Sequence, residues 1–233
     1  MKARLLATLR PLAAGLLLAA AVASSLAAGP AAAASATRTE ANVLFVLDVS
    51  GSMWGRVGGR EKIVVAREAM ADVLADLPSY IAVGLVAYGH RSADDCEDIE
   101  VVAAVGTQSA AALAESIRGL QPRGQTPLSR ALLAAFDEVS GLPGPAHVVL
   151  VSDGSESCGG DPCALVRDLR AAGSRVSYHV VGFAVTAEER SQLECIAGAG
   201  RGDYYTAADL AGLERALATV RRKVLEAVDR PQR

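Results

Sequence analysis

Oxygen-bearing side chains occur at the ends of short apolar runs in separated parts of the chain. Asp48, Ser50 and Ser52 follow the run VLFVL, Thr126 lies in GQTPL, and Asp153 follows VVLVS. Carboxylate and hydroxyl oxygens are the ligands that hard divalent cations prefer in proteins. Two neighbouring carboxylates also repel each other unless a cation lies between them. Together these side chains are therefore a candidate divalent metal site, although each alone could serve as an ordinary turn or capping residue.

The elements that would position these residues alternate between strand-like and helix-like patterns from residue 42 onward. Apolar runs predict six strands, at 43–48, 81–88, 99–105, 148–152, 176–181 and 204–206. Helical patterns lie between or after them, at 62–78, 126–139, 161–173, 186–200 and 208–228. This alternation is typical of an α/β fold with a doubly wound, mostly parallel sheet and helices on both faces. Ligands of such folds bind outside the carboxyl ends of the strands, where Asp48 and Asp153 are predicted to lie.

Local signals refine this prediction. The segment 89–98 is too short and too polar for a crossover helix, so the strands on either side of it should form an antiparallel hairpin at one sheet edge. Thr126 and Asp161 each precede a proline, which predicts two helices with the cap at these residues and the proline at the first helical position. The segment TAEE, which starts at Thr186, matches a capping box.

The first part of the chain has the composition of a targeting segment. Basic residues, an apolar alanine- and leucine-rich stretch and small residues succeed one another over 1–36, with no acidic side chain before Glu40. This order predicts a secretory signal peptide and a protein exported to the periplasm, the cell envelope or the medium. An uncleaved anchor helix is the alternative, but polar and helix-breaking residues interrupt an apolar run shorter than the ~20 residues of a membrane span. After cleavage we expect no membrane span, a folded domain over 41–227 and a polar tail over 228–233.

The net charge of the chain argues against one class of function, nucleic-acid binding. The chain has 23 Lys and Arg against 26 Asp and Glu, a formal net charge of −3. Loss of the three basic residues in the predicted signal peptide lowers this charge to −6, since 20 basic side chains remain against 26 acidic ones. An acidic protein of this kind is not expected to bind nucleic acid.

The four cysteines, in an oxidising compartment, predict disulfide bonds. A zinc site is the rival interpretation, but the three histidines are not spaced with them as zinc ligands. Cys96 and Cys158 are predicted in loops at the carboxyl edge of the sheet, whereas Cys163 and Cys195 are predicted in neighbouring helices. This arrangement favours the pairs Cys96–Cys158 and Cys163–Cys195 over the local pair Cys158–Cys163.

The segments DVSGS, GQTPL and SDG resemble the three parts of the metal ion-dependent adhesion site of von Willebrand factor type A domains. The resemblance extends over 41–227, and the stretches SGSMWG, YGHR, DCEDIE, DGSESCGGDPCALVRDL and CIAGAG are similar to an exported bacterial branch of that family. The resemblance implies that a Mg²⁺ ion, with Mn²⁺ or Ca²⁺ as alternatives, is held directly or through water by Asp48, Ser50, Ser52, Thr126 and Asp153. It also implies that one coordination position stays open for a carboxylate of a protein partner.

Catalysis is not expected at this site. Neither Ser50 nor Ser52 has the flanking glycines of a nucleophile elbow. His147 and His179 fall at the start of a predicted strand and inside one, so only His90 could reach the carboxyl edge as a base. We therefore expect an exported, non-enzymatic, adhesion-type module that captures an acidic group of a macromolecule. A metal-dependent hydrolase and a subunit of a larger envelope assembly are the alternatives.

Three residues near the candidate ligands are candidate partner contacts. Met53 and Trp54 directly follow Ser52, and they either face a partner or pack beneath the loop. His90 either contacts the partner or forms a hydrogen bond within its own loop.

Overall fold

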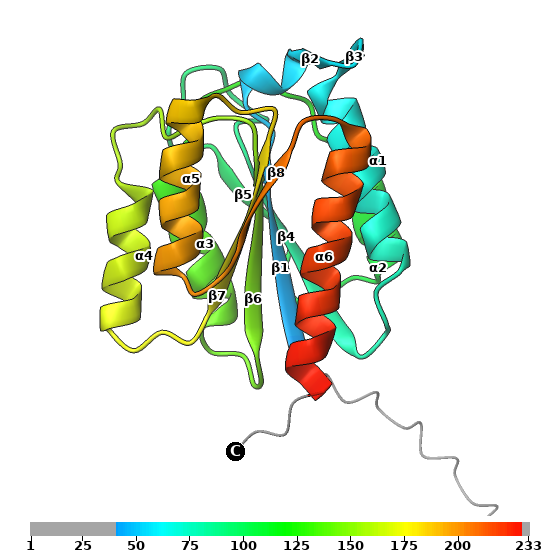
Figure 1. The fold of residues 1–233 in the computed structure, drawn as a ribbon, viewed down its shortest axis with the longest axis vertical. Coiled ribbons are helices and arrows are strands. Elements are labelled where there is room, and N and C mark those ends of the chain that lie inside the picture. The colour runs from blue at the N-terminus through cyan, green and yellow to red at the C-terminus, as the bar shows by residue number, and fades with distance from the viewer. Residues whose placement is uncertain (1–40, 230–233) are drawn as a thin grey trace, which may run out of the picture. The chain divides into compact units, whose positions relative to one another are not determined.

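A six-stranded sheet with the strand order β5-β4-β1-β6-β7-β8 forms the centre of the computed structural model, which describes residues 41–229 (Figure 1). All neighbouring strands are parallel except the edge pair β4 and β5, which is antiparallel. The strands are β1 (Ala41–Asp48), β4 (Ile81–Tyr88), β5 (Ile99–Ala103), β6 (Ala146–Ser152), β7 (Ser177–Phe183) and β8 (Tyr204–Ala207). The predicted fold class is confirmed, and the strand bounds differ from the predicted ones by at most about two residues.

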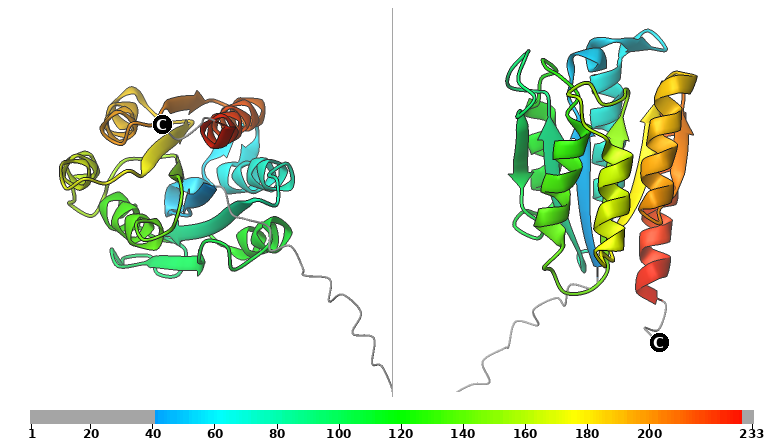
Figure 2. Two further views of the ribbon diagram at one scale, coloured as in Figure 1. Left: turned by 90° about the horizontal axis from the view of Figure 1, so that it is seen from below. Right: turned by 90° about the vertical axis from the view of Figure 1, so that its left-hand side faces the viewer.

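Helices cover both faces of the sheet (Figure 2). One layer consists of α1 (Lys62–Ala75), α2 (Ala110–Gly119) and α6 (Leu210–Asp229), and the other of α3 (Leu128–Val139), α4 (Pro162–Ala171) and α5 (Ala187–Ala199). Successive side chains of a strand point to opposite faces, so every second residue of β1 enters a different core. Val43, Phe45 and Leu47 join the first core, and Leu44 and Val46 join the second. A strand buried on both faces explains why β1 is an uninterrupted apolar run.

Two of the three predicted helix starts are confirmed. The Asp161 side chain accepts a hydrogen bond from the Ala164 N–H at 2.8 Å, and Pro162 begins α4. Thr186 and Glu189 form the reciprocal bonds of a capping box at the start of α5.

The third start was placed one residue too early. Helix α3 begins at Leu128 and its cap is Pro127, whose ψ of 63° lies outside the helical region. Thr126 is held in the preceding loop instead, because its backbone N–H and C=O both form hydrogen bonds with Ser157, at 2.8 and 3.1 Å. The Thr126 side chain is therefore not used as a helix cap.

Several elements were not predicted. Helix α2 has Ser109 as its cap, whose hydroxyl accepts from the Ala112 N–H at 3.2 Å. Between β1 and α1 the chain forms a 3₁₀ helix, η1 (Gly51–Trp54), and a small hairpin of β2 (Arg56–Val57) and β3 (Arg60–Glu61). Helix α6 continues through the first two residues of the predicted tail 228–233.

Both favoured disulfides are present. Cys96–Cys158 joins the loop between β4 and β5 to the loop between β6 and α4, and Cys163–Cys195 joins α4 to α5. No helix within residues 41–229 is both long and apolar enough to cross a membrane. The predicted signal peptide, 1–36, lies outside the described residues.

Candidate metal site

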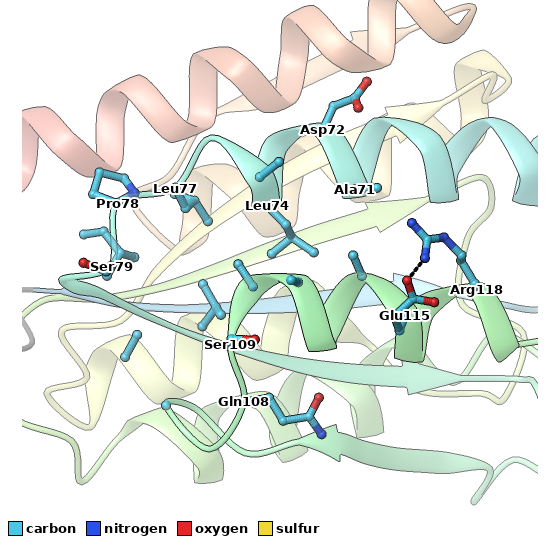
Figure 3. Close-up of a pocket in the computed structure, with 18 residues that line it drawn as sticks. Ala71, Asp72, Leu74, Leu77, Pro78, Ser79, Gln108, Ser109, Glu115 and Arg118 are labelled. Carbon is cyan, nitrogen blue, oxygen red and sulfur yellow. Dashed lines mark hydrogen bonds and ion pairs between the residues drawn. The ribbon is translucent and has the colours of Figure 1, made fainter.

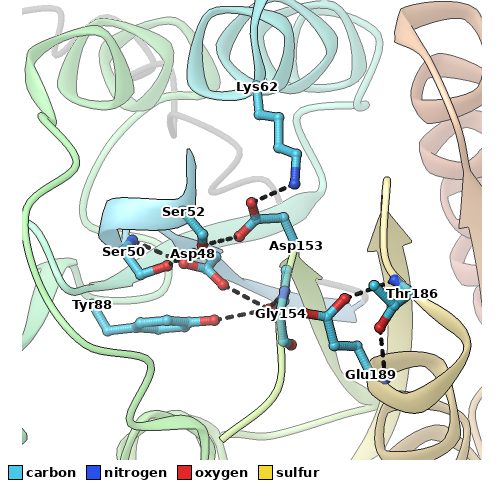
Figure 4. A network of polar contacts seen from close by, with 10 residues as sticks. Asp48, Ser50, Ser52, Lys62, Tyr88, Asp153, Gly154, Thr186 and Glu189 are labelled. Atoms are coloured by element: carbon cyan, nitrogen blue, oxygen red, sulfur yellow. Dashed lines mark hydrogen bonds and ion pairs between the residues drawn. The ribbon is translucent and has the colours of Figure 1, made fainter. Parts of the chain in front are cut away.

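The carboxyl ends of β1 and β6 bring the predicted ligands together (Figure 4). Asp48 is the last residue of β1, and Asp153 directly follows β6. The Ser52 hydroxyl donates to Asp153 Oδ1 at 2.6 Å, and the hydroxyl oxygens of Ser50 and Ser52 lie 2.9 Å apart. The Ser50 backbone N–H donates to Asp48 Oδ1 at 2.8 Å. Four of the five predicted ligands thus form one continuous hydrogen-bonded cluster.

The fifth predicted ligand, Thr126, lies on a loop that contacts the end of β1. Ser50 pairs with Gly124 in a parallel bridge, and the Gly51 N–H donates to the Gly124 carbonyl at 2.9 Å. Thr126 is buried two residues farther along this loop. Within residues 41–229, however, its hydroxyl takes no part in the hydrogen bonds that join the other four side chains.

Two residues that support Asp48 were not anticipated. The Ser152 hydroxyl donates to Asp48 Oδ2 at 2.6 Å, and the Tyr88 hydroxyl donates to Ser152 Oγ at 3.2 Å. With the Ser50 N–H on the other oxygen, both oxygens of this fully buried carboxylate have a donor. The strand register explains why these two residues lie beside Asp48. In the sheet, Asp48 is opposite Tyr88 of β4, and Leu47 is opposite Val151 of β6, the residue before Ser152. Residues that flank Asp48 can therefore be found only once the strand order is known.

A lysine was also missed. Lys62, the first residue of α1, donates from Nζ to Asp153 Oδ2 at 2.8 Å. The Lys62 side chain is 15% exposed and that of Asp153 is fully buried. Nothing in the local sequence distinguishes this lysine from an exposed residue at the start of a helix.

Burial and charge shape the chemistry of the cluster. Burial, followed by the nearby charge of Asp48, raises the pKa of Asp153 from 3.8 to about 6, although the bonds from Lys62 and Ser52 oppose the rise. Burial, followed by the charge of Asp48, raises the pKa of the Tyr88 phenol well above its usual range, so Tyr88 stays a neutral donor. Two buried carboxylates, two neutral hydroxyls and a single ammonium group make an oxygen-rich cluster. These residues fit a hard divalent cation.

Comparison with known proteins identifies the family of the domain. A sequence model of the von Willebrand factor type A domain matches residues 43–156. YwmC from Bacillus subtilis (strain 168), described as an uncharacterized protein, is 31% identical over 192 residues, which cover 76% of this chain and 83% of YwmC. The chain belongs to the von Willebrand factor type A domain family.

Solved structures of type A domains share the fold. The vWF domain of the type V pili tip protein Mfa5 from Porphyromonas gingivalis has a TM-score of 0.66 and 13% identity, over 83% of this chain and 97% of that one. The pilus adhesin SpaC from Lactobacillus rhamnosus GG has a TM-score of 0.65 and 14% identity, over 79% of this chain and 30% of SpaC. At such identities the similarity shows the fold alone.

The three candidate partner contacts of this type A domain differ in accessibility. Trp54 is 46% exposed, and its indole N–H donates to the Pro122 carbonyl at 2.8 Å, which fixes the ring at the surface. Met53 is fully buried in the core, so it packs beneath the loop and cannot face a partner. His90 is buried, and its Nε2 lies 2.9 Å from Glu100 Oε2. Burial thus corrects the partner-contact prediction for Met53 and favours the internal hydrogen-bonding alternative for His90.

A groove of about 790 Å³ lies between α1, α2 and the start of β4 (Figure 3). Its lining includes Leu74, Leu77 and Ala114, together with the ion pair of Glu115 and Arg118. The groove is at the amino end of β4, whereas the candidate ligands lie at the carboxyl ends of β1 and β6. It is therefore separate from the candidate metal site.

Proposed function

We propose that this type A domain is an exported, non-enzymatic binding module that captures an acidic group of a protein partner through a divalent ion. Asp48, Ser50, Ser52, Thr126 and Asp153 would hold the ion. Mg²⁺ is the proposed ion, with Mn²⁺ and Ca²⁺ as alternatives, and when bound it would supply positive charge with a coordination position open to a carboxylate. The observation that carries the proposal is the continuous cluster of Asp48, Ser50, Ser52 and Asp153 at two adjacent strand ends.

The residues of the chain have distinct tasks in this proposal. Asp48 is immobilised by its bonds to the Ser50 N–H and the Ser152 hydroxyl, so it needs no reorganisation to meet a cation. Ser50 and Ser52 offer neutral oxygens, which leave part of the ion's charge uncompensated for an incoming anion. Trp54 lies close to Ser52 in sequence and offers an exposed aromatic surface to the same partner.

Further features support export and a protein partner. The two disulfides suit an oxidising compartment, and the segment 1–36 has the composition of a signal peptide. A pilus adhesin and a pilus tip protein are among the proteins that share the fold. The histidine nearest the site, His90, is bonded to Glu100, which leaves it poorly placed as a general base.

Metal titration of the purified mature protein tests the proposal. Calorimetry should detect Mg²⁺ binding by the wild type, none by Asp48→Ala or Asp153→Ala, and weaker binding by Thr126→Ala, which removes only a neutral oxygen. Asp94→Ala is the matched control, because Asp94 is an exposed carboxylate in the loop between β4 and β5. It should bind Mg²⁺ as the wild type does. Unchanged Mg²⁺ binding by Asp153→Ala would exclude the site.

Capture of the partner is tested separately. Immobilised wild-type protein should retain a protein from the envelope fraction of the same cells in Mg²⁺ and release it in EDTA. Asp153→Ala should retain none of it. Retention that is insensitive to EDTA would contradict a metal-dependent adhesion role.

A further inference from the structure

Lys62 is the one charged group at the site that the proposed function leaves without a task. Its ammonium donates a hydrogen bond to Asp153 Oδ2, whereas the other oxygen of the same carboxylate, Oδ1, accepts a hydrogen bond from the Ser52 hydroxyl (Figure 4). Asp153 therefore faces the hydroxyl cluster on one side and a cation on the other. Among residues 41–229, Lys62 is the only basic side chain that forms an ion pair with Asp153.

The local backbone holds Lys62 in this position. Its N–H donates to the Gly55 carbonyl at 2.8 Å, which ties the start of α1 to the turn after η1. The lysine stem lies beside Gly55, since a Cβ on Gly55 would be 3.5 Å from Lys62 Cε and 3.8 Å from Cδ. The same Cβ would be only 2.9 Å from the Ser52 carbonyl oxygen, so the turn requires glycine. A side chain that is 15% exposed and fixed in this way is part of the site and not a mobile surface lysine.

The charges around Asp153 give the ammonium a function. Asp48 and Asp153 are both buried, and an isolated buried carboxylate is costly unless it is paired. Lys62 supplies that pair when no ion is bound. A divalent cation that binds Asp153 would lie close to the Lys62 ammonium, which is paired with the same carboxylate. The two positive charges would repel each other strongly at such short range.

We propose that the Lys62 ammonium is the built-in counter-ion of the metal-free site, and that it weakens divalent-ion binding while it stabilises the metal-free fold. This inference rests on the proposed function, because it concerns the same site. In this proposal, the affinity of the site for a divalent ion is set in part by Lys62, a residue that does not itself bind the metal.

Charge-removing variants of Lys62 test the inference. Lys62→Met keeps the apolar stem, and Lys62→Gln keeps a hydrogen-bond donor for Asp153. Both should bind Mg²⁺ at least about tenfold more tightly than the wild type in calorimetry. Both should melt at a lower temperature in EDTA and show a larger rise in melting temperature on addition of Mg²⁺.

Lys223→Met is the control, because Lys223 forms an ion pair of similar length with Asp203 outside the site, at 2.7 Å, although that pair is more exposed. It lowers the net charge of the protein equally and should leave Mg²⁺ affinity unchanged. Mg²⁺ affinity that is equal or weaker in both Lys62 variants, with wild-type binding intact, would overturn the counter-ion role alone. Absence of Mg²⁺ binding by the wild type and by every variant would overturn the proposed function as well.

Discussion

Ser152 and Asp48 lie side by side at the ends of β6 and β1, and the Ser152 hydroxyl donates to Asp48 Oδ2 at 2.6 Å. Asp48 is fully buried, so this bond satisfies an oxygen that water cannot reach. The pair therefore stabilises the protein even when no ion is bound.

Ser152→Ala should lower the free energy of unfolding by about 1–3 kcal/mol, because it leaves a buried carboxylate oxygen with one donor fewer. Urea unfolding in EDTA measures the change. Tyr88→Phe is the control, since it removes only the outer bond, from the Tyr88 hydroxyl to Ser152, and should cost less. A Ser152→Ala protein as stable as the wild type would contradict the supporting role of this bond.

Trp54→Ala should separate partner capture from ion binding. The indole is exposed and makes its hydrogen bond to the Pro122 carbonyl and not to any of the four clustered ligands, so Mg²⁺ affinity should stay within about twofold of the wild type. Partner affinity should fall at least about tenfold, as is usual when a central interface tryptophan is removed. Binding assays in Mg²⁺ compare it with Leu133→Ala, an exposed apolar side chain on α3 that should have no effect. Equal partner affinity in both variants would remove Trp54 from the interface.

The buried pair of His147 and His179 should make the protein sensitive to acid. The two rings stack with centroids 5.6 Å apart, and Asp203 and Lys223 lie beside His179. Burial, followed by the neighbouring His179, lowers the pKa of His147 from 6.5 to about 4. The folded pKa is below the unfolded one, so the contribution of His147 is fully retained above about pH 6.5. It is lost as the pH falls toward 4, up to about 3 kcal/mol.

Asp153 has the opposite effect on stability over the same pH range. Its pKa is raised to about 6 in the folded state, so its protonation as the pH falls favours the folded protein. The contribution of His147 is therefore measured as the difference in the free energy of unfolding between the wild type and His147→Gln, because Asp153 is present in both. Urea unfolding at several pH values gives this difference. The wild type should lose stability relative to the variant as the pH falls from 6.5 to 4. A difference that stays constant with pH would show that His147 does not titrate in this way.

The two disulfides should have different effects on the site. Each closes a long loop, with a sequence separation of 62 for Cys96–Cys158 and 32 for Cys163–Cys195, so removal of either should cost about 4 kcal/mol of loop-closure entropy. Only the first bond joins loops that follow β4 and β6 near the candidate ligands. The double Cys→Ser variant of the first pair should therefore weaken partner capture, whereas that of the second should lower stability alone. Equal partner affinities would contradict this distinction.

The elements that could be predicted from the sequence are those whose own residues determine them. Strand β1 was predictable because an apolar run buried on both faces leaves few alternatives. Helix α2 was missed because its alanine-rich segment buries few large side chains, Leu113 and Ile117 among them. The two-residue strands β2 and β3 are too short for any periodicity to be recognised.

The residues of the candidate site also divide into those with a local sequence signal and those without one. Asp48 and Asp153 were found because each ends a recognisable strand, and the serines because they follow Asp48 at once. Lys62 meets Asp153 across 91 residues of sequence, through the packing of α1 over the strand ends. Such a contact leaves no local signal, so the ion pair of Lys62 with Asp153 could be found only in the structure.

The direction of β1 gives the domain two opposite poles. Ala41 begins the strand and Asp48 ends it, which separates them by roughly 23 Å at the usual rise per residue. Helix α6 also ends at the pole where β1 begins (Figure 1). A support coupled through either end of the described chain would therefore hold the domain with its candidate ligands turned outward, away from the support, an orientation that suits the capture assays above.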